Sequence, residues 1–473
     1  MATVQPVRVR AGRGVELGLL LLALAVGWAA YALVGLGTAD RVPADAVWYG
    51  VGMAAMALGM HGVLRWRAPF ADPVILPVVV ALNGIGLAMI YRIDVAEHTD
   101  YARKQLVWTA LSMVLAAAVL VALRDHRTLR RYTYTAMVVG LVLLVSPLVP
   151  GLGRDVNGAQ IWVRVAGVGL QPAELAKIAL AVFFAGYLVT NRDTLTLAGP
   201  RVLGVQLPRL RDLGPIVVVW GTSLAVLVLQ RDLGTSLLLF GLFVAMLYLA
   251  TERVSWVLIG LVLFVFGAWA AAVAFPHVGA RFDVWLHALD PAQYDKSPGG
   301  SWQLVQGLFG LANGGLFGTG WGQGRPDIVT FAQSDFIVTS LGEELGLTGL
   351  VAILLLYAVL TERGLRTAIG VRDGFGKLLT GGLAFVMAFQ VFVVVGGVTR
   401  LIPLTGLTTP FLAYGGSSLL ANWVIAALLL RVSDDARRPA PAVRAPITGP
   451  TPVVPAPPAG DEQPTERIAG GRP

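Results

Sequence analysis

The sequence contains no cysteine and little charge. Without a thiol among its 473 residues, the chain has neither disulfide bonds nor thiolate metal sites. Only 14% of the residues are charged, whereas 56% are hydrophobic, a composition typical of integral membrane proteins. A P-loop, HExxH, GxSxG and dinucleotide fingerprint are all absent, and the five histidines lack metal-ligand spacing. Nucleotide-driven pumps and zinc hydrolases are therefore not expected.

Long hydrophobic runs predict transmembrane helices. A spanning helix needs roughly 20 apolar residues, and about twelve segments approach that length. They lie near residues 16–37, 46–64, 74–92, 105–123, 133–150, 172–190, 214–230, 234–250, 255–275, 336–360, 378–397 and 410–431. The predicted class is an all-α polytopic membrane protein.

The distribution of basic residues predicts which side each connection faces. Lys and Arg concentrate in alternate connections, such as 124–131 and 363–377, and such connections are usually cytoplasmic. An even number of spans then places both termini in the cytoplasm. The longest connection, 276–335, is extracytoplasmic and is predicted to be an ordered, re-entrant or amphipathic cap. From 433 the chain is rich in proline, which predicts a disordered cytoplasmic tail.

Glu174 and Lys177 are the most informative charged residues. They lie one helical turn apart at the start of an apolar run, so they share one helix face. Charged groups at membrane depth are expensive and usually serve a polar site inside the bundle. The alternative is an intrahelical ion pair that only lowers the cost of insertion.

Other polar residues fall at the predicted outer ends of helices and suggest one outward-facing polar cleft. Each has a structural alternative: Asp335 as a helix N-cap, Glu343 and Glu344 as a solvated helix end, and Arg400 as a side chain reaching the headgroups. The small residues around Ser417 also suit close helix packing. The polar set is Arg164, Gln171, Asp232, Asp335, Glu343, Glu344, Arg400 and Ser417.

Five motifs in order resemble the SEDS family (shape, elongation, division and sporulation). They are 171–177, 232–235, 318–324, 335–346 and 403–418, within a resemblance that runs from about 72 to 432. The stretch 396–410 is similar to the RodA, or elongation, branch more than to the FtsW, or division, branch. The resemblance implies ten core spans, so 1–71 adds two N-terminal helices, 72–432 forms the core and 433–473 is the tail.

The resemblance also implies a function. SEDS proteins are peptidoglycan glycosyltransferases of the bacterial plasma membrane that polymerise lipid II, a disaccharide-peptide on undecaprenyl pyrophosphate, and release the lipid pyrophosphate. Their essential carboxylate lies in the long outer loop, which matches Asp295. Asp290 is the runner-up, because this loop is one residue longer than the family pattern.

Further roles follow from the same resemblance. Lys177, Arg164 and Arg400 are candidates to hold the pyrophosphate, and Gln171, Glu174 and Ser417 to line the same site. A divalent cation, Mg²⁺ or Mn²⁺, is an open expectation. The expected partners are membrane lipids and a class B penicillin-binding protein (a transpeptidase), with no nucleic acid. A lipid II flippase and a division-specific polymerase are the alternative functions.

The predicted topology can be tested directly, because single cysteines introduced into this cysteine-free chain report sidedness. A Ser297→Cys variant should react with a membrane-impermeant maleimide in intact spheroplasts. An Ala456→Cys variant should react only after permeabilisation. The opposite pattern would exclude an extracytoplasmic location for 276–335.

Overall fold

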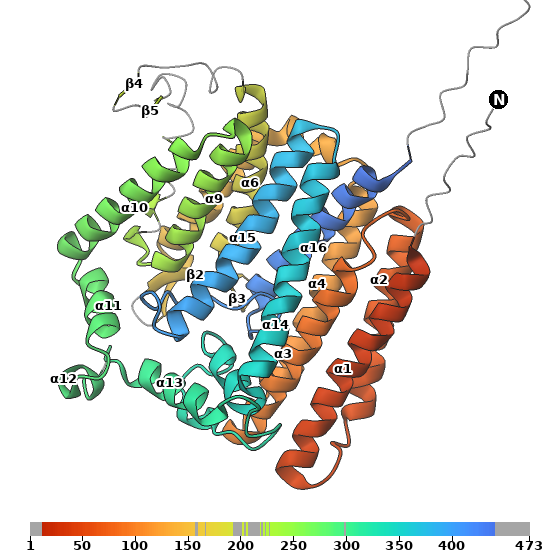
Figure 1. Cartoon of the computed structure of the whole chain (residues 1–473), viewed down its shortest axis with the longest axis vertical. Helices are drawn as coiled ribbons and strands as arrows, with labels where there is room; N and C mark the ends of the chain where they lie inside the picture. Colours follow the sequence, from red (N-terminus) through yellow and green to blue (C-terminus); the bar gives the residue numbers. More distant parts are fainter. Residues whose placement is uncertain are drawn as a thin grey trace, which may run out of the picture. The chain divides into compact units, whose positions relative to one another are not determined.

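The computed structural model describes residues 12–156, 159–165, 167–192, 228–297 and 299–439, together with short pieces between 201 and 226. Figure 1 shows a bundle of long helices that lie side by side. The predicted tail, from 440 onward, lies outside the described residues.

Within the described residues, 11 helical segments are long and apolar enough to cross a membrane. Ten are single α-helices, and the other is η1 (His126–Tyr132), α5 (Thr133–Val145) and η2 (Ser146–Leu148) in succession. The ten are α1 (Arg13–Ala39), α2 (Ala46–Arg67), α3 (Ile75–Glu97), α4 (Tyr101–Ala122), α6 (Pro172–Thr190), α9 (Leu233–Thr251), α10 (Val254–Ala274), α14 (Ile337–Gly370), α15 (Gly374–Val398) and α16 (Gly416–Arg437). These segments match eleven of the twelve predicted spans, and the other, 214–230, lies partly outside the described residues.

The helices pack as neighbours that are often distant in sequence. Helix α1 packs along α3, α16 along α4, and α14 along α15, while α6 contacts α5, α9 and α15. The most buried helices are α3, α6, α15 and α16, whereas α10 is almost entirely exposed. A helix that is apolar all round and exposed in the chain suits contact with lipid. The prediction of a helical, multi-pass membrane protein is confirmed.

The long connection between α10 and α14 is ordered, as predicted. It contains α11 (Pro276–Leu286), α12 (Pro291–Tyr294), α13 (Trp302–Gly314) and the 3₁₀ helix η3 (Pro326–Ile328). Figure 1 shows these short helices along one end and edge of the bundle. Helix α13 contacts α14, which attaches the connection to the core.

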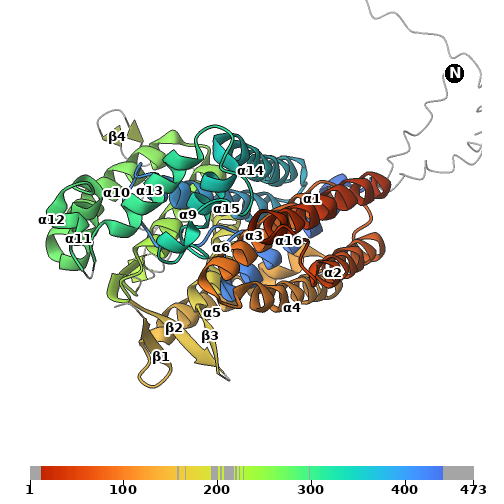
Figure 2. The same cartoon turned by 90° about the horizontal axis from the view of Figure 1, so that it is seen from below.

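A small sheet is a feature that the sequence did not predict. Strands β1 (Gly153–Val156), β2 (Ala159–Val165) and β3 (Val168–Leu170) form an antiparallel sheet in the order β1-β2-β3, which extends beyond the helices in Figure 2. The signal is the run of β-branched and aromatic residues at 161–163, which are types enriched in strands. Two shorter strands, β4 (Arg201–Val202) and β5 (Val205–Gln206), pair with each other.

Gly346 allows a break inside α14. Its φ of 68° and ψ of −172° are not helical, and only glycine adopts such a conformation without strain. A Cβ at this position would also overlap the backbone of Gly318. The break therefore lets the chain that follows α13 approach the backbone of α14.

The two N-terminal helices are fastened to the core by a buried group of ionisable side chains. Glu16 of α1 pairs with Arg13, and its other oxygen lies 2.7 Å from His61 Nδ1 of α2. Arg13 also donates to the backbone carbonyl of Ala71, which precedes α3. Farther along the helices, a Cβ on Gly27 would lie 3.1 Å from the Cα of Gly84, so small residues let α1 and α3 approach closely.

Removing one member of this buried group should destabilise the protein. Glu16→Ala leaves the Arg13 guanidinium buried without its carboxylate, and breaking a buried pair in this way costs about 3–5 kcal/mol. We expect a lower thermal unfolding midpoint in detergent. The matched control is Asp100→Ala, which removes an exposed pair with Lys104 and should leave the midpoint unchanged. Equal midpoints for both variants would contradict this role for Glu16.

Candidate functional site

Glu174 and Lys177 belong to a buried polar cluster at the start of α6. Gln171 precedes the helix and Pro172 takes its first position, where a missing N–H costs nothing. The Lys177 Nζ donates to Glu174 Oε2 at 2.5 Å and to Gln390 Oε1 at 2.9 Å. Because Gln390 belongs to α15, Lys177 does more than pair with Glu174 within α6. It also joins α6 to α15.

The same cluster reaches the broken segment between α15 and α16. Gln390 Nε2 donates to the Thr408 carbonyl at 2.8 Å. On the other side, the Gln171 N–H donates to Ser417 Oγ at 2.8 Å. Gln171, Glu174 and Lys177 thus lie at the start of α6, with Ser417 in contact with Gln171. Their shared role in binding stays a prediction.

Asp232 caps α9 and presents a second carboxylate oxygen to the interior. Its Oδ1 accepts from the Thr235 N–H at 2.9 Å, while its Oδ2 is buried without a partner in the described part of the chain. Burial raises the pKa of Asp232, and the nearby charge of Glu174 adds to that shift. Asp232 therefore lies within electrostatic reach of the α6 cluster.

Arg281 of α11 is the cation that faces Asp232. Burial lowers the pKa of Arg281, whereas the charges of Asp232 and Asp335 oppose that shift. Its Nη1 donates to the carbonyls of Leu404 and Thr405 at 3.1 and 3.2 Å. Arg281 thus links the connection between α10 and α14 to the segment between α15 and α16, within electrostatic reach of two carboxylates.

Asp335 does not cap the following helix, so that alternative was wrong. Helix α14 begins at Ile337, the residue before it is Phe336, and no side chain caps its first turn. Burial raises the pKa of Asp335 to about 6, against the opposing effects of the Ser334 hydroxyl and the Arg281 charge. Asp335 is therefore a second carboxylate within electrostatic reach of Arg281, and its pKa of about 6 lies close to neutral pH.

Arg400 holds the outer connection in place. Its backbone has a φ of 61°, and its guanidinium donates to the carbonyls of Trp285 and Leu286, both at 2.8 Å. In return, Trp285 Nε1 donates to the Arg400 carbonyl at 3.0 Å. A cation at the carbonyl end of α11 also complements the helix dipole. The guanidinium is thus occupied by the protein in this conformation.

Glu343 and Glu344 are buried, so a solvated helix end was the wrong alternative for both. Glu344 Oε1 accepts from Arg92 Nε of α3 at 2.7 Å, and Glu343 Oε1 accepts from Asn313 Nδ2 of α13 at 3.0 Å. The two carboxylates attach neighbouring segments to α14. In the described part of the chain, their hydrogen bonds do not involve residues of the α6 cluster.

Asp295 and Asp290 are exposed at the two ends of α12. Ser301 closes the turn that carries them, because its N–H donates to the Gln293 carbonyl at 2.9 Å and its Oγ to the Ala288 carbonyl at 2.6 Å. Among the described residues, no hydrogen bond or ion pair joins the Asp295 carboxylate to the α6 cluster. Arg164, on β2, is likewise exposed and donates to the Gly167 carbonyl at 3.2 Å.

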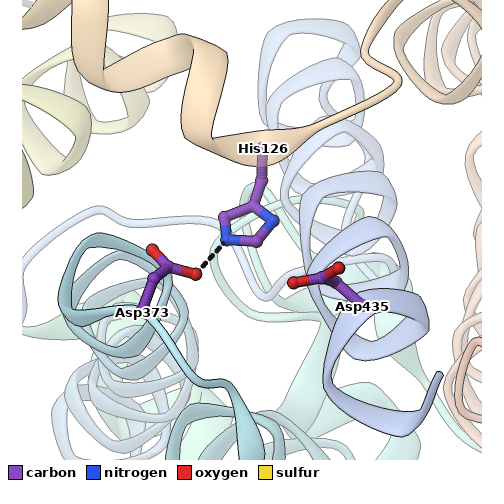
Figure 3. A group of neighbouring side chains, drawn as sticks. All are labelled: His126, Asp373 and Asp435. Atoms are coloured by element: carbon purple, nitrogen blue, oxygen red, sulfur yellow. Dashed lines mark hydrogen bonds and ion pairs between the residues drawn. The ribbon is translucent and has the colours of Figure 1, made fainter. Parts of the chain in front are cut away.

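A histidine and two aspartates lie together at the opposite end of α15. Figure 3 shows His126 between Asp373 and Asp435, with 2.7 Å between His126 Nε2 and Asp373 Oδ2. Arg127 pairs with both carboxylates, at 3.4 and 3.1 Å, so a cation of the protein already neutralises them. This cluster precedes Gln390 by about 25 Å of helix and does not belong to the α6 site.

The profile of the FtsW/RodA/SpoVE family of cell cycle proteins matches residues 73–438. The chain belongs to the FtsW/RodA/SpoVE family. The peptidoglycan glycosyltransferase RodA of Mycobacterium tuberculosis is 48% identical over 446 residues, which cover 92% of this chain and 94% of the relative. A probable peptidoglycan glycosyltransferase FtsW of Trichlorobacter lovleyi is 33% identical, covering 81% of this chain and 98% of that protein.

A solved structure shares the fold of this chain. A chain from a study of how a peptidoglycan synthase complex coordinates polymerization and crosslinking superposes with a TM-score of 0.62 at 26% identity. The match covers 78% of this chain and 99% of the solved one. The SEDS resemblance and the RodA-like fold predicted from the motifs are therefore confirmed.

The sequence did not single out three residues that hold segments together in the structure: Gln390, Arg92 and Arg281. Gln390 is a polar residue inside the apolar run of α15, which is itself a sign of function in a membrane span. Arg92 and Arg281 lie among other charged residues, so their types alone did not distinguish them. Only the packing of α3 against α14 and of α11 near α9 identifies their partners.

The raised pKa of Asp335 predicts a pH dependence of stability. The pKa rises from 3.8 to about 6, so the folded state binds this proton more tightly than the unfolded state does. The free energy of unfolding therefore decreases as the pH rises from about 4 through 6. The decrease is up to about 3 kcal/mol, because one pKa unit corresponds to about 1.4 kcal/mol.

The Asp335→Asn variant cannot ionise at this position. As the pH rises from 4 to 7, the thermal midpoint of the parent should therefore fall relative to that of the variant. Asp283→Asn, on the exposed side of α11, is the control and should follow the parent at every pH. A constant difference between parent and Asp335→Asn would contradict this assignment.

Proposed function

We propose that this protein is a peptidoglycan glycosyltransferase that polymerises lipid II into glycan strands during cell elongation and the maintenance of cell shape. The reaction releases undecaprenyl pyrophosphate at the outer face of the bacterial plasma membrane. The observation that carries the proposal is the 48% identity, over nearly the full length of both chains, to a relative named as a glycosyltransferase.

The same comparison favours elongation over division. Identity to the RodA relative is 48%, against 33% for the FtsW relative. A flippase, the other alternative, lacks comparable support. Transporters also tend to carry an internal repeat, and this sequence shows no convincing repeat.

Asp295 is the proposed general base. It accepts the proton of the acceptor 4-hydroxyl while that oxygen forms a bond to the anomeric carbon of the growing chain, and the bond from that carbon to the pyrophosphate breaks. A positioned carboxylate typically contributes about 10²–10⁴-fold to such a step. Support comes from the resemblance of the loop motif and from the exposure of Asp295 on a closed turn of the outer connection.

The leaving pyrophosphate needs positive charge. Lys177, Arg164 and Arg400 remain the candidates from the sequence, and the structure adds Arg281, which is within electrostatic reach of Asp232 and Asp335. Lys177 and Arg400 are already hydrogen-bonded by the protein, so binding by either requires an exchange of partners. Arg164 is exposed, and it also donates to the protein, to the Gly167 carbonyl at 3.2 Å. The apolar tails of the substrate would lie among the helices, within the lipid.

A divalent cation fits the residues in one respect. Mg²⁺ and Mn²⁺ prefer oxygen ligands and often bind through one or two carboxylates together with substrate phosphates. Asp232, with its unpartnered buried Oδ2, and Asp335 would hold such an ion. When bound, it would neutralise charge on the pyrophosphate.

The proposed partner is a class B penicillin-binding protein, which would crosslink the strands made by this chain. Support comes from the solved structural relative, whose study concerns coordinated polymerization and crosslinking in a synthase complex. A transpeptidase at the outer face requires the growing strand to emerge there, which agrees with the proposed extracytoplasmic location of 276–335. Both termini are proposed to be cytoplasmic.

Incubation of the purified protein with lipid II, followed by gel analysis, tests the function. The parent should produce polymer, and Asp295→Asn should reduce its rate by about 10²-fold or more, because the amide cannot accept the hydroxyl proton. Asp283→Asn should retain the parental rate, since it changes an exposed carboxylate in the same outer connection.

The outcomes separate the residue from the function. An active parent and an equally active Asp295→Asn would exclude Asp295 and transfer the role to Asp290, tested by Asp290→Asn. A parent that binds lipid II but yields no polymer, alone and with the transpeptidase, would exclude the proposed function.

A further inference from the structure

The hairpin formed by α1 and α2 is additional to the family core. The family match begins at residue 73, and the solved relative is covered almost completely by 78% of this chain. In the RodA relative of Mycobacterium tuberculosis, however, the match covers 92% of this chain. The unmatched 8% is about 38 of 473 residues, too few to omit a 72-residue N-terminal segment. That relative therefore shares at least part of the hairpin.

The outer end of the hairpin touches a glycine-rich segment, 318–324, that follows α13. A Cβ on Gly37 would overlap the Trp321 carbonyl oxygen, so the two backbones are in direct contact. Gln323 Nε2 donates to the Gly37 carbonyl at 2.5 Å. Gly322 has a φ of 83°, and a Cβ there would lie 3.0 Å from the Thr38 backbone nitrogen. Both sides of this contact therefore require glycine.

Helix α14 holds the same segment from the other side. Glu344 accepts hydrogen bonds from the N–H groups of Gly322 and Gly324, at 2.9 and 3.2 Å. Arg92 pairs with Glu344 and donates to the Gly324 carbonyl at 2.7 Å. The segment thus lies between α1 and a buried carboxylate, with partners on both faces.

The hairpin is rigid where it makes this contact. The ring of Tyr31 stacks between those of Tyr49 and Tyr91, with centroid distances of 4.3 and 4.2 Å. The Tyr31 hydroxyl donates to Asp45 Oδ2 in the turn of the hairpin, at 2.9 Å. Stacked aromatic rings join α1 to both α2 and α3, so the outer end of α1 is fixed relative to the core.

The segment is connected through α13 to the turn that carries Asp295. A Cβ on Gly314, the last residue of α13, would overlap the Gly342 carbonyl oxygen, so this end of α13 contacts α14. At the other end, Gln306 Nε2 donates to the Tyr294 hydroxyl at 2.8 Å, and the Tyr294 and Trp302 rings lie 5.0 Å apart. Displacement at 318–324 would therefore move one end of the helix whose other end supports Asp295.

We infer that the α1–α2 hairpin is a positioning element for catalysis: it clamps segment 318–324 against Glu344 and so sets the place of α13 and of the Asp295 turn. This role rests on the proposed function. The acting residue is Gly37, which touches no reacting group and works through the backbone of Trp321 and Gly322. Misplacement of a catalytic group by about 1 Å can cost about 10²-fold in rate.

The test compares Gly37→Ala with Gly59→Ala. Both add one methyl group to an N-terminal helix, but a Cβ on Gly59 meets nothing within 4 Å. Gly37→Ala should lower kcat for lipid II polymerisation by about 10-fold or more, with KM changed less than 2-fold, because it misplaces the base and spares the binding groups. Amide exchange of Gly322 and Gly324 should also become faster, since the clamp loosens. Gly59→Ala should match the parent in all three measurements.

A milder variant guards against misfolding. Gln323→Ala removes one hydrogen bond to Gly37 without adding volume and should shift kcat and exchange in the same direction. Faster exchange with an unchanged kcat would overturn the positioning role, as would a parental value of both quantities in Gly37→Ala. A parent without polymerase activity would overturn the proposed function itself, so the two failures are distinguished by the parent.

Discussion

An ionised side chain inside a membrane protein needs a partner, and this constraint organises the structure. Lys177 meets it through Glu174 and Gln390, and Arg92 meets it through Glu344. Breaking such a pair leaves a buried charge, which is far more costly than losing an exposed ion pair. Each pair therefore fixes helices that are far apart in sequence, α6 to α15 and α3 to α14.

Arginine side chains also provide hydrogen-bond partners for backbone carbonyls that lie outside the helices. The segment between α15 and α16 contains carbonyl groups without helical partners, and such groups are tolerated at membrane depth only where the protein satisfies them. Arg281 donates to the Leu404 and Thr405 carbonyls, and Arg400 donates to the carbonyl end of α11. These reciprocal contacts attach the outer connection to the bundle, which explains why a connection of this length is ordered.

The polar groups on and near the connection between α10 and α14 are of two kinds, buried or half-buried and exposed. Asp232 is buried, Arg281 and Asp335 are half-buried, and their charges influence one another's pKa. Asp295 is exposed on a short closed turn. A reaction that transfers a sugar from an apolar lipid carrier to a hydrated acceptor suits this division, because the anchored substrate needs a largely buried polar support and the acceptor needs an accessible base. The N-terminal hairpin adds a further support on the far side of the outer connection.

The sequence alone determined the features that depend on local properties. A span follows from the length of one apolar run, and the shared face of Glu174 and Lys177 follows from their spacing on one helix. The motifs in order identified the family. The run of β-branched and aromatic residues at 161–163 was also present, but it was too short to predict a sheet.

Tertiary structure alone decided the partners. Gln390 for Lys177, Arg92 for Glu344 and the contact of Gly37 with Trp321 each join segments separated by many residues. Asp335 resembled a helix cap in sequence and is instead a half-buried carboxylate within electrostatic reach of Arg281. A residue type and its neighbours in sequence specify what a side chain is able to bind. Which group lies within reach depends on how the helices pack, and that is a property of the whole bundle.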